Sequence, residues 1–123
     1  MNLKEIVSEY KNHKDFIQAL KDKLIEIGTR EPDFVYNPFR TKVGCCYNGP
    51  CKMNGRFGPD CKGCIFGTAL QEMGWDSEEE MRSGKWIVSL LYYYANISLP
   101  RDFGEAQDLQ DIGKSWGEAI KVL

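Results

Sequence analysis

Histidine, long apolar runs and net charge are the features that this sequence has least of. Its 123 residues include one histidine, His13, which stands among charged residues and is expected to be solvated. The local sequence suggests neither a Ser/His/Asp nor a Cys/His pairing, so a catalytic nucleophile is not expected. The sequence therefore favours a binding protein over an enzyme.

The lack of a long apolar run and of net charge limits the compartment and the partners. No stretch is long and apolar enough to cross a bilayer. The first residues alternate charged and apolar side chains, which is untypical of a secretory signal. We therefore expect a cytoplasmic protein, in the cytosol of a host cell, whose thiols stay reduced. A net charge of −2 argues against a general nucleic-acid or membrane-surface binder, so neither partner is expected.

Length and the spacing of apolar residues predict one domain over residues 1–123. We expect a mainly α (α+β) class, a compact helical domain of about four to five helices with a short β-hairpin and Cys-rich loop insert. Its expected parts are N-terminal helices over 1–28, a strand and Cys-rich loop over 30–63, and a helical C-terminal part over 64–123.

The N-terminal part has a helical apolar stripe over residues 3–27, with a polar interruption at 12–14. Asn12 or Asp15 is expected to cap a second helix there, and Gly28 is expected to end it. Helical periodicity returns at Cys64, and Gly74 is expected to end that element.

Capping patterns predict two further helix starts. Ser77 and Glu80 form a capping box before an apolar helix that reaches residue 95, with Gly84 as a point where it can split. This helix is expected to lie centrally, because its apolar residues occupy more than one face. Asp102 begins a similar capping pattern, and the apolar residues from 106 to 123 predict one continuous last helix.

The insert between these helical parts carries extended and turn signals. Residues 34–36 and 43–47 are expected to form short strands, and Asn-Gly pairs at 48–49 and 54–55 are strong turn signals.

All five cysteines lie between residues 45 and 64. Two residues separate Cys61 from Cys64, a gap that lets both thiolates reach one Zn²⁺ in a tight turn. A second pair would complete a tetrahedral site, and the predicted ligands are Cys46, Cys51, Cys61 and Cys64. The alternative is that these reduced cysteines are small buried apolar residues. Zinc is thus one possible cofactor, and the sequence suggests no other.

The same region is locally basic on an acidic chain, which suits a small anion. The cations expected to meet negative charge are Arg40, Lys42, Arg56 and Lys62, and the rings expected to stack are Tyr36 and Tyr47. The helix that follows Cys64 would add backbone amides at Gly67 and Thr68 to cap an oxyanion. The alternatives are an ordinary helix start and aromatic side chains that anchor a loop to the core.

Four short stretches together resemble a group of small accessory proteins found in phages and prophages. They are Glu31-Pro-Asp-Phe-Val-Tyr36, Cys46-Tyr47, Cys64-Ile-Phe-Gly-Thr-Ala-Leu-Gln-Glu-Met-Gly74 and Gln110-Asp-Ile-Gly-Lys-Ser-Trp-Gly-Glu-Ala-Ile120. The resemblance implies a phage or mobile-element accessory protein.

These observations lead to three functional hypotheses. The first is a phage-type, non-enzymatic binding protein that sequesters a small anionic, nucleotide-derived ligand in counter-defence. The second is an interaction module, stiffened by zinc, that inhibits a host protein or a nucleic-acid enzyme. The third is a small enzyme acting on nucleotides. Three tyrosines at 92–94, with Gly113 and Gly117 four residues apart, also suggest self-association as a homo-oligomer.

Overall fold

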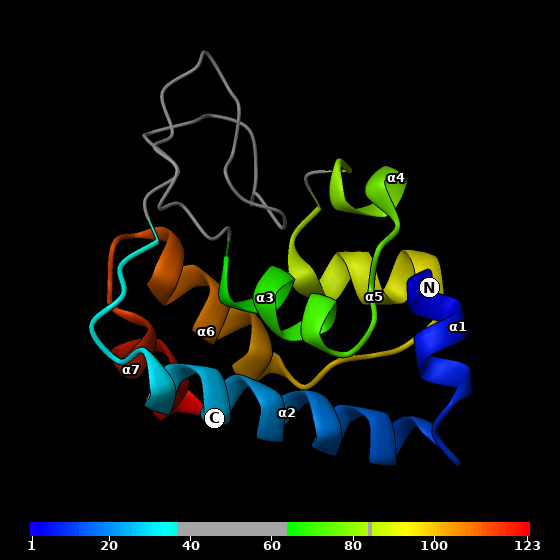
Figure 1. The fold of residues 1–123 in the computed structure, drawn as a ribbon, viewed down its shortest axis with the longest axis horizontal. Coiled ribbons are helices and arrows are strands. Elements are labelled where there is room, and N and C mark those ends of the chain that lie inside the picture. Colours follow the sequence, from blue (N-terminus) through cyan, green and yellow to red (C-terminus); the bar gives the residue numbers. More distant parts are fainter. Residues whose placement is uncertain (37–63, 84) are drawn as a thin grey trace.

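The computed structural model describes residues 1–36, 64–83 and 85–123, and these residues are mainly helical (Figure 1). This part of the expected fold class is confirmed. The helices are α1 (Leu3–Ser8), α2 (His13–Arg30), α3 (Ile65–Glu72), α4 (Glu78–Met81), α5 (Ile87–Ala95), α6 (Arg101–Asp111), α7 (Trp116–Ala119) and the 3-10 helix η2 (Ile120–Val122).

Helix α2 runs along one side of the fold and packs against α3 and α7 (Figure 1). Helix α6 contacts both α5 and α7, and α1 contacts α5, so the N-terminal and C-terminal parts share one apolar core. Within the three described stretches, no helix is both long and apolar enough to span a membrane.

The apolar stripe predicted over residues 3–27 is buried, but it belongs to two helices. Asn12 begins the second one, because its side chain accepts a hydrogen bond from the Asp15 backbone N–H at 2.8 Å. The prediction that Gly28 ends this helix is wrong, since α2 continues to Arg30. Gly28 instead allows close packing: a Cβ there would lie 2.7 Å from the side chain of Ile120.

Helix α3 ends as expected, at Gly74, whose φ of +108° suits glycine. Ser77 caps α4 as expected, by accepting a hydrogen bond from the Glu80 N–H. The Glu80 carboxylate, however, leaves its own helix and accepts hydrogen bonds from the Leu3 N–H at 2.8 Å and the Trp75 indole N–H at 2.9 Å. This buried acid therefore links the start of α1 to the α3–α4 connection.

A second long-range cap lies at the start of α5. Trp86, the residue before this helix, provides no side-chain cap. Gln107 of α6, which is fully buried, fills that role, because its Oε1 accepts a hydrogen bond from the Ile87 N–H at 2.6 Å. Helices α5 and α6 are thus joined by a polar contact inside an apolar interface.

The prediction of one continuous last helix capped by Asp102 is wrong. Helix α6 begins at Arg101, after Pro100, with no side-chain cap. It ends at Asp111, with Ile112 as its C-cap, because Gly113 has a φ of +99°, which a continuing α-helix excludes. Ser115 then caps the short helix α7 by accepting a hydrogen bond from the Glu118 N–H at 3.2 Å.

The predicted β-hairpin is not shown. Its first strand, at 34–36, is reduced to one isolated antiparallel bridge between Val35 and Ser115. Two flanking hydrogen bonds hold this contact: Trp116 N–H to Phe34 O at 2.8 Å and Gly117 N–H to Pro32 O at 2.9 Å. The second strand, at 43–47, lies outside the described residues.

Candidate functional site

Four of the predicted site residues belong to the described chain: Tyr36, Cys64, Gly67 and Thr68. The others lie outside it, so the cationic ligand site and the zinc site that they would form stay predictions. These others are Arg40, Lys42, Cys46, Tyr47, Cys51, Arg56, Cys61 and Lys62.

Tyr36 and Cys64 flank the undescribed stretch, and both are core residues. Tyr36 is 1% exposed and Cys64 is 0% exposed. A ring with so little accessible surface cannot stack on a ligand, so Tyr36 serves the core rather than the stacking role that the sequence predicts for it.

The backbone N–H groups of Gly67 and Thr68, at the start of α3, form hydrogen bonds within the chain. The Gly67 N–H donates to Cys64 Sγ at 3.3 Å, and the Thr68 N–H donates to Cys64 O at 3.0 Å. Cys64 thus acts as the helix cap, in the way that serine commonly does. Because both amides are engaged within the chain, the predicted oxyanion cap at Gly67 and Thr68 has no support from this geometry. Within residues 1–36, 64–83 and 85–123, no three His, Cys, Asp or Glu side chains gather as metal ligands.

Sequence reasoning missed the polar hub at Gln110, which joins three helices. This side chain is fully buried, and its Oε1 accepts hydrogen bonds from the Ile65 N–H at 3.0 Å and the Trp116 indole N–H at 3.2 Å. Its Nε2 donates to Asp111 Oδ1 at 2.9 Å. Gln110 opens one of the sequence stretches that carry the resemblance, but only the fold shows which groups its side-chain amide contacts.

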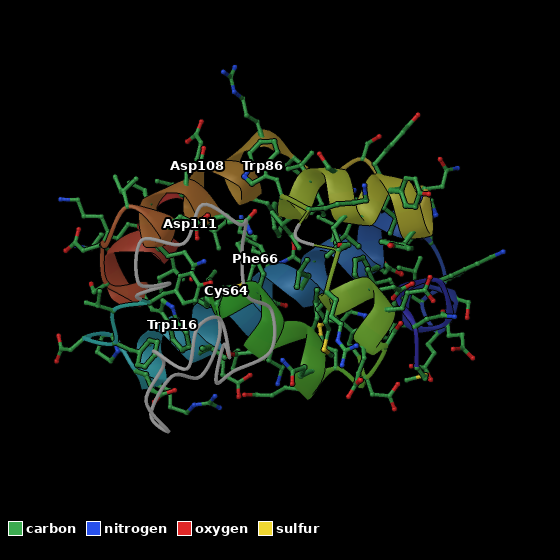
Figure 2. All side chains as sticks on the ribbon, turned by 90° about the horizontal axis from the view of Figure 1, so that it is seen from above. Cys64, Phe66, Trp86, Asp108, Asp111 and Trp116 are labelled. Carbon is green, nitrogen blue, oxygen red and sulfur yellow. The ribbon has the colours of Figure 1, made fainter. Side chains whose placement is uncertain are left out.

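Asp111, beside this hub, has a carboxyl whose pKa is raised above its ordinary value. Although the residue reaches the surface, partial loss of hydration raises the pKa of its carboxyl to about 6. The Gln110 hydrogen bond lowers this pKa, and the nearby charge of Asp108 raises it. Figure 2 shows both acids on α6, with Cys64 and Phe66 at the start of α3. Asp111 can exchange a proton near neutral pH, but no described interaction pairs it with a nucleophile.

A groove of about 360 Å³ lies beside α5 and is one candidate binding site in the described part of the chain. Helix α5 ends with Asn96 as its C-cap, which has a φ of +55°, and the Ile97 N–H donates to Leu91 O at 3.1 Å. The segment after the turn then runs next to the helix. The groove is lined by Lys85, Val88, Ser89, Tyr92, Tyr93, Ser98 and Leu99.

This groove, which we call the α5 groove, combines aromatic rings with a cation. Tyr92 is 62% exposed and Tyr93 is 69% exposed, which is unusual for such large rings. The Lys85 ammonium lies over the Tyr93 ring, 4.5 Å from its centroid. The Tyr94 ring also packs edge-to-face with Tyr93, with 4.8 Å between the ring centroids. The expectation that this helix lies centrally describes one face of it, where Ile87, Leu90 and Leu91 are buried. The tyrosines of the other face are exposed to solvent.

A second hollow, of about 410 Å³, lies between the end of α2 and α3. Its lining includes Arg30, Thr68 and Glu72, and Arg30 Nη2 donates to Glu72 Oε2 at 2.7 Å. The charges in this hollow are paired. The hydrogen bond from Arg30 is the main cause that lowers the pKa of the Glu72 carboxyl, and the positive charges of Arg30 and Lys23 lower it further. Since its charges are already paired, this hollow offers a ligand less than the α5 groove does.

Comparisons with known proteins add no assignment to this geometry. No protein-family model matches the chain, and neither the curated proteins nor the solved structures contain a match. The function is therefore argued from the residues and their arrangement.

Proposed function

We propose that this protein is a phage-type, non-enzymatic binding protein that sequesters a small anionic, nucleotide-derived ligand in counter-defence. The observation that carries the proposal is the α5 groove, where one ammonium group lies beside two exposed tyrosine rings. Aromatic rings stack on bases, and a neighbouring cation stabilises the phosphate. The groove also has the size of a small-molecule site.

The basic residues before Cys64 support the same class of ligand from the sequence. Arg40, Lys42, Arg56 and Lys62 would add positive charge, and Tyr47 would add a ring. Tyr36 and Cys64, the described residues on either side of this segment, are buried in the core. The proposal does not use the amides of Gly67 and Thr68.

Calorimetric titration of the purified protein tests this proposal. The probes are nucleoside monophosphates, cyclic mononucleotides, cyclic dinucleotides and ADP-ribose, with inorganic phosphate as the control for charge alone. We expect at least one nucleotide to bind and to raise the melting temperature, while phosphate does neither. If no nucleotide binds, the proposed function is wrong.

A second candidate function is an interaction module that inhibits a host protein or a nucleic-acid enzyme, with zinc as a stabilising ion. The exposed rings on and before α5 favour it, since Trp86 is 41% exposed in addition to Tyr92 and Tyr93. Tryptophan and tyrosine are the residues that most often dominate binding energy at protein interfaces. Native mass spectrometry separates the two functions, because it reports bound nucleotide, bound zinc, a host partner and homo-oligomers in one measurement.

A further inference from the structure

The side chains that line the α5 groove indicate which part of the ligand it holds, an inference that rests on the proposed function. We propose that the groove binds the nucleoside part, with the base stacked on Tyr92 and the sugar beside Ser89 and Ser98. Three properties of the groove lead to this assignment: which side chains are already engaged, what the remaining ones offer, and its size.

Two of the lining side chains are already engaged within the protein. The Lys85 ammonium lies 4.5 Å from the centroid of the Tyr93 ring, and Tyr94 packs edge-to-face on the same ring. Lys85 also takes part in an interaction besides this contact. We therefore assign the ligand to the other lining residues, without any contribution from the Lys85 charge.

The Tyr92 ring is an aromatic surface that stays open. It lines the groove and is 62% exposed. Among the residues that the structure describes, no ring contact, ion pair or hydrogen bond engages its side chain. Stacking on an aromatic side chain tolerates any base, because every base has a π-face. With Val88 and Leu99 as apolar lining, the groove is expected to hold a planar base without selecting one base in particular.

The hydroxyl groups and the size of the groove agree with a nucleoside. Ser89 on α5 and Ser98 on the segment after it both line the groove, and both are exposed. A serine hydroxyl can donate and accept hydrogen bonds, so it can pair with the hydroxyls of a sugar. A volume of about 360 Å³ is near the lower end of the range for small-molecule sites. Such a groove accommodates one nucleoside better than both nucleosides of a cyclic dinucleotide.

Titration calorimetry that compares nucleosides with their phosphates tests this inference. The probes are adenosine, guanosine, cytidine and uridine, the 5′-monophosphate of each, and ribose 5-phosphate, which has a sugar and a phosphate but no base. We expect at least one nucleoside to bind within about tenfold of its monophosphate, because the base and the sugar supply most of the affinity. Ribose 5-phosphate should not bind, since it cannot stack on Tyr92.

Variants of Tyr92 test the stacking itself. Tyr92→Ala should weaken binding of that nucleoside about tenfold through lost stacking, whereas Tyr92→Phe keeps the ring face and should retain the affinity. Ile112→Ala is the matched control, because it removes a side chain that is 73% exposed and lies outside the groove lining. It should leave the affinity unchanged. Since Tyr92 is exposed, its variants are expected to fold, which circular dichroism verifies.

The outcomes separate this inference from the function on which it rests. If no nucleotide of any class binds, the proposed function fails, and this inference fails with it. If nucleotides bind but no nucleoside comes within about tenfold of its monophosphate, this inference is overturned while the proposed function stands. The same holds if ribose 5-phosphate binds as tightly as the monophosphates, or if Tyr92→Ala binds the nucleoside like the unchanged protein.

Discussion

Replacing Gln110 by leucine should remove the polar contacts that join α3, α6 and α7 while keeping a side chain of similar size. In the unchanged protein, Gln110 Oε1 accepts hydrogen bonds from the Ile65 N–H at 3.0 Å and the Trp116 indole N–H at 3.2 Å. Leucine leaves both donors without this acceptor in a buried region. Each unsatisfied buried donor costs about 1–3 kcal/mol, so for two donors we expect a loss of about 2–6 kcal/mol in the free energy of unfolding.

Urea unfolding followed by tryptophan fluorescence and by circular dichroism measures this loss. The matched control is Gln18→Leu, because Gln18 donates to Asp22 on the exposed surface of α2 and should cost little. A Gln110→Leu variant within about 0.5 kcal/mol of the unchanged protein would refute the reasoning. It would mean that the two N–H groups find other acceptors, or that the hub does not hold the helices together.

Other predictions concern packing, protonation and the cap of α3. Gly28→Ala should destabilise the protein by about 1–3 kcal/mol, because the new Cβ would lie 2.7 Å from the side chain of Ile120. Thermal unfolding measures this loss, and an unchanged melting temperature would contradict the close packing of Gly28 on Ile120. In the folded state the pKa of the Asp111 carboxyl is raised from 3.8 to about 6, so the folded protein holds this proton more tightly than the unfolded chain does. The contribution of Asp111 to the free energy of unfolding therefore falls as the pH rises from 3.8 to about 6. The melting temperature of Asp111→Asn minus that of the unchanged protein should therefore increase over this pH range and then level off. A difference that does not change with pH would contradict this. Cys64→Ser should retain the cap on the Gly67 N–H, whereas Cys64→Ala should lose about 1 kcal/mol, as urea unfolding will report. Equal losses in both cysteine variants, together with loss of a bound zinc ion, would instead assign Cys64 to a metal site.

Local sequence signals predicted those parts of the fold that depend on neighbouring residues. The apolar stripe of α2, the cap at Asn12 and the end of α3 at Gly74 each arise within about one helical turn. Gly28 and Gly113 show the limit of such signals. Both are glycines in a helical pattern, yet one packs against Ile120 and the other ends α6, and only the tertiary structure separates these roles.

The candidate site was less predictable, because distant residues build it. The partners of Gln110 are 45 residues before it and 6 residues after it, so no local pattern indicates its role. The tyrosines of α5 continue an apolar run that predicts a central helix, but Tyr92 and Tyr93 are exposed in the structure. The amides at Gly67 and Thr68 were expected to be available, but Cys64 accepts both.

Mapping where a nucleotide contacts the protein tests the central claim most directly. Backbone and side-chain NMR spectra of the labelled protein should be recorded while nucleoside monophosphates, cyclic mononucleotides, cyclic dinucleotides or ADP-ribose are added. The account predicts that the largest shifts lie along the α5 groove, at Lys85, Ser89, Tyr92, Tyr93 and Ser98. Shifts confined to other parts of the chain, or no shifts with any of these nucleotides, would contradict it.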